Sequence, residues 1–395
     1  MNKILIVSCV FPPEPVVSAK LSCDIAERFH SLGKEVVVIS PKPSRPLNYK
    51  FLKKSDSFPF KHIVLNSYTC ASSDLWGRFK ESRSFGRSTY RYIQEHCQEI
   101  DAIYANTWPL FAQFYLAKVA QKHGIPYYIH VQDIYPESYC KKMPKVMGHF
   151  LYCLLKPIDK YVLCHARGVI AISPSMKDYL LKSRNLDQNK VELVRNWQND
   201  KAYIDAYKPI EEMHKKVNVM YLGSINPTAN VTLILQAFSN LDNEKYCLNI
   251  IGNGPEKEKC QELANKLGIM VSFDSVTPDM VAKKQSEADV LVLCLKKGVA
   301  QTATPSKLTA YMLSGRPIIA SVDTDSDCAK IIRESGSGIV VEPDNTQDLR
   351  DAIQRIANLE LEELRIMGAK AYHYALKHLS KEQNLNKLIY FIEND

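Results

Sequence analysis

Short apolar runs alternate with amphipathic stretches along the chain, and this alternation predicts strands and helices in regular succession. KILIVSCV, which begins at residue 3, is a continuous apolar run typical of a strand buried on both faces of a parallel sheet. A turn, a helix ending at Gly33 and a second apolar run, KEVVVIS, follow it. These segments predict a βαβ unit, in which the loop after the first strand is where ligands approach an open parallel sheet.

The same alternation predicts a doubly wound α/β domain in residues 1–197. Within it, residues 42–90 are rich in Lys, Ser and Phe and predict an insertion or a mobile surface loop, which either faces a membrane or is simply exposed to solvent. Residues 144–167 are amphipathic, and we expect Pro157 to interrupt a helix there.

A second alternation begins at VNVMYLGS, after a polar stretch without periodicity at residues 196–214 that predicts a linker. It predicts a second doubly wound domain, residues 198–379. The closing segment, residues 380–395, is expected to form a helix that packs back on the first domain. Two domains of ordinary size agree with a length of 395 residues.

The composition agrees with a soluble globular protein, because 46% of the residues are hydrophobic and 24% are charged. No apolar run approaches the roughly 18 to 20 residues of a membrane span, and the first run is too early and too short for a signal peptide. We therefore expect a cytoplasmic protein. The 11 cysteines include no C-x-x-C pair, which favours reduced packing residues over a metal site or a disulfide framework.

The charge is distributed unevenly between the two halves. Residues 1–200 hold 28 Lys and Arg against 17 Asp and Glu, whereas residues 201–395 hold 23 against 26. A basic first half favours an anionic partner, either a phospholipid surface or nucleic acid, and solubility alone is the alternative. No basic segment carries the interleaved aromatic residues of a nucleic-acid stacking surface, so we expect the inner face of the plasma membrane as a peripheral site and no nucleic-acid partner.

The stretch QTATPSKLTAYMLSGRPIIAS, residues 301–321, carries the clearest chemical signal. It predicts a tight loop, a helix from about residue 307 to residue 314, and a buried strand. Ser306 is the expected N-cap, and Lys307 adds a cation to the partial positive charge of the helix start. The stretch therefore predicts a phosphate site, with an ordinary capped helix as the alternative.

Three glycines follow predicted strands of the second domain and predict close approach of backbone to a ligand. Gly223 ends the first of these strands and would admit phosphates close to the main chain. Gly252 and Gly254, in GNGPE, would lie at the same edge, because parallel strands present their carboxyl ends together. Plain turn glycines are the alternative interpretation.

Two carboxylates in the first domain are candidates for acid–base work. Asp133 and Glu137 lie in the loop after the apolar strand IPYYIHVQ, where either could orient or deprotonate an acceptor hydroxyl. An Asx turn at Asp133 and a helix cap at Glu137 are the structural alternatives. His130 precedes them within the strand and is more typical of a packed core histidine.

Several motifs in a fixed order resemble glycosyltransferase family 4, which has the GT-B fold. They are the N-terminal FPPE loop, the strand–GSINPTANVTLILQAF–strand–GNGPE–strand–DVLVL–PSKLTAYMLSGRPIIAS succession and the stretch VELVRNWQND. HVQDIYPES together with PSKL resembles the bacterial members that build capsule, exopolysaccharide or O-antigen repeats. The resemblance covers essentially the whole chain.

The resemblance implies two Rossmann-like domains that face each other across a cleft, and a retaining sugar transfer that needs neither metal nor cofactor. The donor, a UDP- or GDP-sugar, would bind the C-terminal domain. Thr304, Ser306, Lys307 and Leu308 would lie at its diphosphate, and the main chain at Val276 would contact the base. The acceptor, a polyprenyl-diphosphate-linked saccharide, would bind the N-terminal domain. Fixed N–H dipoles and a cation would stabilise the leaving diphosphate.

The chain departs from the family pattern at several positions near the donor and the acceptor. Where the family carries two Glu residues, this chain has Thr302 and Ala310, and its paired basic residues fall on Ser224 and Ala229. Other departures are Val16, Val17 and Gln132. Lys296, Lys297 or Arg316 would then assist Lys307. These departures leave two alternatives open, a catalytically silent GT-B partner subunit and a GT-B sugar-nucleotide epimerase.

Overall fold

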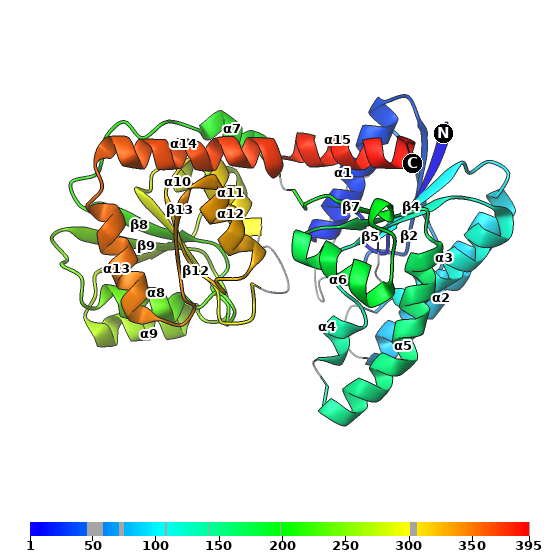
Figure 1. The fold of residues 1–395 in the computed structure, drawn as a ribbon, viewed down its shortest axis with the longest axis horizontal. Helices are drawn as coiled ribbons and strands as arrows, with labels where there is room; N and C mark the ends of the chain where they lie inside the picture. The colour runs from blue at the N-terminus through cyan, green and yellow to red at the C-terminus, as the bar shows by residue number, and fades with distance from the viewer. Residues whose placement is uncertain are drawn as a thin grey trace. The chain divides into compact units, whose positions relative to one another are not determined.

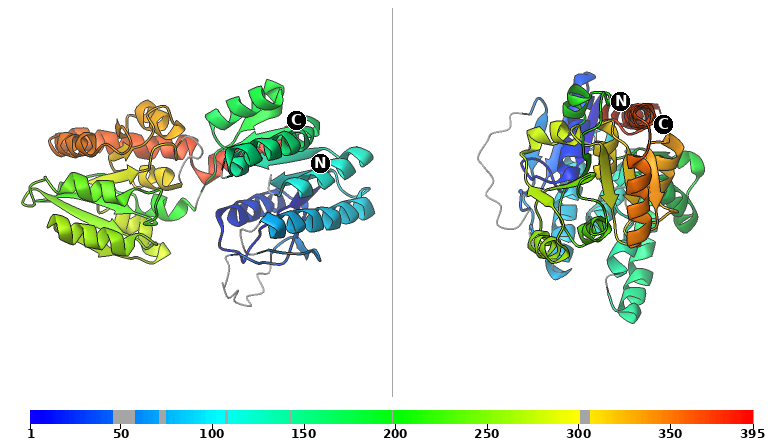
Figure 2. Two further views of the ribbon diagram at one scale, coloured as in Figure 1. Left: turned by 90° about the horizontal axis from the view of Figure 1, so that it is seen from below. Right: turned by 90° about the vertical axis from the view of Figure 1, so that its left-hand side faces the viewer.

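The computed structural model describes residues 1–45, 58–70, 75–106, 109–141, 143–197, 199–300 and 306–394. The chain divides into two compact units, one made of residues 1–195 and 385–395 and the other of residues 196–384 (Figure 1). Helices cover both faces of the parallel sheet in each unit (Figure 2). Each unit is a doubly wound α/β domain, which confirms the predicted α/β class of both domains.

The first unit contains a parallel sheet in the order β3-β2-β1-β4-β5-β6-β7. Its strands are β1 (Lys3–Val7), β2 (Glu35–Ser40), β3 (Lys61–Val64), β4 (Ala102–Asn106), β5 (Tyr127–Val131), β6 (Gly168–Ala171) and β7 (Val191–Leu193). Its helices are α1 (Val17–Ser31), α2 (Leu75–His96), α3 (Leu110–His123), α4 (Glu137–Cys140), α5 (Lys145–His165), α6 (Pro174–Arg184), the 3-10 turn η1 (Gln188–Lys190) and the end of α15 (Lys381–Asn394).

The second unit contains a parallel sheet in the order β10-β9-β8-β11-β12-β13. Its strands are β8 (Val217–Leu222), β9 (Tyr246–Ile251), β10 (Val271–Asp274), β11 (Val290–Cys294), β12 (Ile318–Ser321) and β13 (Gly338–Val341). Its helices are α7 (Lys201–Ala206), α8 (Val231–Phe238), α9 (Lys257–Leu267), α10 (Val281–Gln285), α11 (Ser306–Leu313), α12 (Asp327–Ser335), α13 (Thr346–Ala357), α14 (Leu361–His378) and the 3-10 turn η2 (Pro278–Met280).

The strand order in the second unit reverses its direction between β8 and β11. Successive strands run outward from β8 in one direction to β10 and from β11 in the other direction to β13. β8 and β11 are neighbours, with Val290 opposite Val219 and Leu291 opposite Met220. In open α/β sheets ligands bind outside the carboxyl ends of the strands at such a switch point. The segments that follow β8 and β11 are therefore the first place to look for a site.

Two predictions in the first unit are wrong in part. Residues 42–90 include β3, which pairs in parallel with β2, and most of α2, so their described part is not simply an inserted loop. Pro157 does not interrupt the amphipathic stretch, because α5 continues through it from Lys145 to His165. The helix thus contains Pro157 in its interior, although proline has no backbone N–H to donate to the helical hydrogen bonds. Residues 46–57 and 71–74 lie outside the described residues.

The C-terminal segment forms α15, and its last turns contact the first unit. Lys34 forms an ion pair of 2.9 Å with Glu393, and Lys387 forms one of 2.8 Å with Glu192. The ring of Phe391 lies edge-on to Tyr128 at a centroid distance of 5.9 Å. Charged and aromatic contacts together attach the end of the chain to the first unit.

Candidate functional site

The start of α11 in the second unit holds a lysine in a defined environment. Lys307 lies in the first turn of the helix, and its side chain is half-buried. Its ammonium group donates to the hydroxyl of Tyr221 and, at 3.3 Å, to the carbonyl of Ser224, and it lies 4.5 Å from the centre of the Tyr221 ring. The side chain therefore extends from α11 to the segment that follows β8, where the strand order predicts a ligand.

Burial changes the proton affinity of this lysine. It lowers the pKa of Lys307 to about 8, because the charged form loses hydration that neutral partners replace only in part. Its two hydrogen-bond partners, a phenol and a carbonyl, carry no negative charge. An anion brought to the ammonium would therefore gain a strong electrostatic interaction in a poorly hydrated setting.

Gly223 packs directly against Lys307. A Cβ atom built on Gly223 would lie 2.2 Å from Cε of the lysine, closer than non-bonded atoms approach. Gly252 is as tightly placed, since its Cβ would lie 1.9 Å from the carbonyl oxygen of Gly223. A Cβ on Gly254 would meet the carbonyl oxygen of Ile225 at 2.1 Å. The three predicted glycines thus lie in one chain of contacts that ends at Lys307, with Gly252 and Gly254 packed against backbone and Gly223 packed against the lysine side chain.

Two tyrosines that the sequence analysis did not single out hold this arrangement. The hydroxyl of Tyr221 donates to the carbonyl of Ser224 at 2.6 Å and fixes the turn after β8. The hydroxyl of Tyr311 accepts from the backbone N–H of Leu222 at 2.9 Å and lies 3.0 Å from its carbonyl, linking α11 to the end of β8. Both lie inside apolar runs, VNVMYL and AYML, where a tyrosine resembles a core residue. No sequence signal separates them from packing.

The remaining donor-side predictions fall in different surroundings. Leu308 is fully buried in the core beneath α11, so its side chain serves packing. Val276 follows β10 and is half-buried against the same core. Ser306 is the first residue of α11, one position before the expected helix start, and its capping role stays a prediction. Thr304 and Thr302 lie outside the described residues.

The three residues expected to assist Lys307 do not share one location. Lys296 and Lys297 are exposed and follow β11 at its carboxyl end. Arg316 precedes β12, at the opposite end of the strands, and it is only 6% exposed. Its guanidinium donates to the backbone carbonyls of Ser286 and Lys208. The prediction that Arg316 helps to bind a donor is therefore wrong, because its bonds join elements at the amino end of the sheet.

Two of the departures from the family pattern are small side chains buried in the second unit. Ala229 and Ala310 are 2% and 4% exposed. An alanine at these positions supplies neither the cation nor the carboxylate that the family carries there. Any binding of a nucleotide sugar therefore relies on the other groups of the site, with Lys307 as its half-buried cation.

In the first unit, Asp133 and Glu137 follow β5 but differ in their surroundings. Asp133 is exposed in the loop after the strand. Both carboxylate oxygens of Glu137 accept from the guanidinium of Arg184, at 2.6 and 2.8 Å, and Oε1 also accepts from the hydroxyl of Tyr179 at 2.9 Å. Arg184 is fully buried and also binds Asp159 at 2.7 Å.

These contacts suit Glu137 for a structural role. Burial alone would raise the pKa of Glu137, but the hydrogen bonds and charge of Arg184 outweigh it and the pKa is lowered. A carboxylate that stays ionised and is held by three hydrogen bonds is a poor proton acceptor. Of the two predicted catalytic carboxylates, the geometry favours Asp133.

Two other polar residues of the first unit serve its structure. His130 is fully buried, and its Nδ1 lies 2.7 Å from the hydroxyl of Tyr104. Burial lowers the pKa of His130 to about 3, so the ring is neutral, as expected of a core histidine. Glu14, in the FPPE loop, accepts the backbone N–H groups of Ser44 and Arg45, each at 2.9 Å. The sequence analysis did not identify this link between the loop and the residues after β2.

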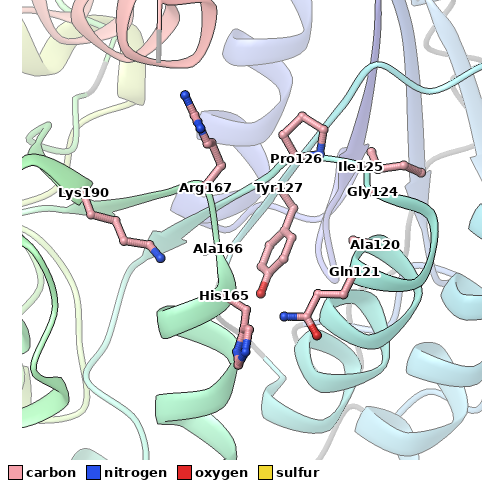
Figure 3. A pocket seen from close by; sticks show the side chains of 10 residues that line it. All are labelled: Ala120, Gln121, Gly124, Ile125, Pro126, Tyr127, His165, Ala166, Arg167 and Lys190. Carbon is pink, nitrogen blue, oxygen red and sulfur yellow. The ribbon is translucent and has the colours of Figure 1, made fainter.

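A surface hollow of about 430 Å³ in the first unit is not a candidate for the predicted acceptor site. Figure 3 shows its lining side chains, which include Tyr127, His165, Arg167 and Lys190. Tyr127 is the first residue of β5, so the hollow lies at the amino end of the strand. Asp133 lies beyond the other end, where open parallel sheets bind ligands.

Within the ranges given above, no three His, Cys, Asp or Glu side chains gather as a metal site would require. Over the same ranges, no helix has the length and apolar character needed to span a bilayer.

Two family models together match most of the chain. One, described as Glycosyltransferase Family 4, matches residues 19–200, and the other, described as Glycosyl transferases group 1, matches residues 205–374. The boundary between the two matches falls close to the boundary between the two units.

Individual proteins show the same similarity. The probable glycosyltransferase WbjE of Pseudomonas aeruginosa is 22% identical over 67% of this chain and 68% of its own length. The putative colanic acid biosynthesis glycosyl transferase WcaI of Escherichia coli is 22% identical over 98% of each chain. The crystal structure of Anabaena Alr3699/HepE in complex with UDP superposes with a TM-score of 0.72 at 13% identity, covering 100% of both chains. The last likeness shows the fold.

Proposed function

Because this chain belongs to the glycosyltransferases that join a family 4 domain to a group 1 domain, we propose that it transfers a sugar from a UDP- or GDP-sugar, with retention at the anomeric carbon. The acceptor is a saccharide linked to polyprenyl diphosphate, and the product is a repeat of a bacterial surface polysaccharide. The transfer uses no metal and takes place at the inner face of the plasma membrane, where the chain binds peripherally.

The observation that carries the proposal is the position of Lys307. It combines a helix start, a half-buried ammonium and a glycine-lined backbone at the carboxyl ends of β8 and β9. Backbone N–H groups at the start of α11 and the ammonium would bind the donor diphosphate. As the bond to the sugar breaks, the diphosphate gains negative charge, and the same groups would stabilise it more strongly than in the ground state.

The relatives support the finer parts of the proposal. WcaI is described as acting in colanic acid biosynthesis, and the HepE crystal contains UDP, which favours a uridine donor. The basic first half of the chain would attract anionic lipid by about 1 kcal/mol for each Lys or Arg near the surface. Asp133 would orient or deprotonate the acceptor hydroxyl.

The direct test is a donor screen. Thermal denaturation in the presence of single UDP- and GDP-sugars should show one donor that raises Tm, because a ligand that binds only the folded state stabilises it. Incubation of that donor with lipid-linked saccharides should then give a product whose anomeric configuration, read by NMR, equals that of the donor. An inverted product would contradict retention.

A second candidate function rests on Ala229 and Ala310. Their small buried side chains replace groups that the family uses at the donor, which would suit a catalytically silent subunit that partners an active transferase. Such a subunit would show no stabilisation by any sugar nucleotide in the same screen.

A further inference from the structure

An apolar pocket of about 390 Å³ lies within the first unit, away from the surface hollow of Figure 3. Side chains from α2, the start of α3, the loop before α4 and the first half of α5 line it. Those that matter most here are Phe79, Phe111, Tyr135, Leu151, Leu154 and Leu155. Its size falls within the range of about 300–1,000 Å³ that holds small ligands.

The pocket continues onto an exposed apolar surface. Leu154 lines the pocket and is 58% exposed, and one turn earlier on α5 Phe150 is 72% exposed. Val146, Met147 and Trp76 also present more than half of their surface to solvent. In Figure 1 the first turns of α5 extend beyond the sheet. So many large apolar side chains at one place mark a contact with lipid or with another molecule.

The pocket also borders the predicted acceptor side. Leu110 closely follows the carboxyl end of β4, and Tyr135 closely follows the carboxyl end of β5. Asp133 lies two residues before Tyr135 in the same loop. A ligand in the pocket would therefore have its apolar end beside the exposed surface and its other end toward the candidate catalytic carboxylate.

The helices that line the pocket are net basic, which favours an anionic head group. Arg78 lines the pocket, where it also binds Glu81 at 3.2 Å. The sequence of α2 carries five Lys and Arg against two Glu, and that of α5 carries three Lys against one Asp. A long apolar body next to negative charge is the chemistry of a polyprenyl diphosphate.

We propose that this pocket binds the first isoprenoid units of the polyprenyl-diphosphate-linked acceptor, with the diphosphate directed toward the basic helix α2 and the saccharide beyond it directed toward Asp133. The inference rests on the proposed function and adds the place where the lipid is held. Protruding side chains alone would suffice to lie on a membrane. A concave apolar pocket beside the reacting end instead fits a single chain drawn out of the bilayer.

Leu154→Glu and Phe150→Glu are the matched variants that test the pocket. Both place a carboxylate on the same exposed face of α5, but only Leu154 lines the pocket. The probe is radiolabelled farnesyl diphosphate in equilibrium dialysis without detergent. Wild type should bind saturably, Leu154→Glu about tenfold or more weakly, and Phe150→Glu within twofold of wild type. Leu151→Ala, which only enlarges the pocket, should weaken binding about threefold.

Three results would overturn the proposal that the pocket binds the lipid. These are no saturable binding by wild type, equal losses in the two Glu variants, or displacement of the probe by inorganic pyrophosphate as readily as by unlabelled farnesyl diphosphate. Binding to phosphatidylglycerol vesicles without binding of the probe would assign the surface to the bilayer instead. Titration of wild type with UDP and with GDP separates the two proposals. Binding of neither nucleotide would contradict the transferase, whereas the result with farnesyl diphosphate would still report on the pocket.

Discussion

Gly223 lies so close to Lys307 that a single methyl group on the glycine would occupy the space of the lysine's Cε, at 2.2 Å. The backbone at the end of β8 therefore lies directly beside the ammonium group that Lys307 carries on the first turn of α11. The proposed diphosphate site depends on this contact.

Removal of the ammonium should weaken donor binding most. Lys307→Ala takes away charge-assisted hydrogen bonds worth about 1.5–3 kcal/mol, so the affinity for UDP measured by titration calorimetry should fall about 10- to 100-fold. Lys245→Ala is the matched control, because Lys245 is exposed just before β9, at the amino end of the sheet and away from the proposed site. Equal losses in both variants would indicate a general charge effect rather than a site at Lys307.

Donor affinity should depend on pH through the same residue. The pKa of Lys307 is lowered to about 8 by burial, so the free protein loses this positive charge as the pH rises through 8. The phosphates stay ionised above pH 7, and UDP affinity should therefore fall about tenfold between pH 7 and pH 9. Lys307→Arg keeps its charge over this range and should give a nearly flat profile. A sloping profile in the arginine variant would assign the effect to another group.

Substitution of the glycines at the strand ends should affect UDP binding and folding stability to different degrees. Gly223→Ala displaces a flexible lysine and should reduce UDP affinity about tenfold, with a stability loss of about 1 kcal/mol. Gly252→Ala meets the backbone carbonyl of Gly223 at 1.9 Å and should cost about 3 kcal/mol in urea unfolding. Gly268→Ala, at a φ of +66° and with no atom within 4 Å, measures the cost of a left-handed backbone without any steric clash. Unchanged UDP affinity in Gly223→Ala would contradict the shared site.

Substitution of Asp133 should lower the catalytic rate, whereas substitution of Glu137 should lower the stability of the fold. Asp133→Asn should lower kcat by about 100-fold, in the range of general-base catalysis, while UDP affinity and Tm stay close to wild type. Its carboxylate is exposed, so little stability depends on it. A variant with normal kcat would remove Asp133 from the catalytic assignment.

Glu137→Ala should instead destabilise the fold. It leaves the buried guanidinium of Arg184 without its bidentate partner, which costs about 3–5 kcal/mol for a buried pair. Urea unfolding should show this loss. A variant as stable as wild type but with greatly reduced kcat would return Glu137 to the catalytic assignment.

The sequence predicts the fold well where burial alone decides. β1 and β11 are continuous apolar runs, and both are central strands of parallel sheets. The sequence does not predict α2, because LWGRFKESRSFGRSTYRYIQEH is too rich in polar and basic residues to show a clear apolar stripe, although the helix packs against α3.

The candidate site was predictable only where its residues carry a local signal. Lys307 follows Ser306 at a helix start, and Gly223 ends an apolar run, so both could be named in advance. Tyr221 could not, since a tyrosine in VNVMYL looks like any core residue. The partner of Glu137 lies 47 residues further along the chain, and no periodicity relates the two. Contacts between distant segments decide such roles.

Crystal structures of the protein soaked with UDP and with GDP test the central claim most directly. The account predicts that one of the two nucleotides places its β-phosphate at the first turn of α11, within hydrogen-bond distance of Nζ of Lys307 and against the backbone of Gly223. Both nucleotides bound elsewhere, or both absent from this place at saturating concentration, would contradict the account.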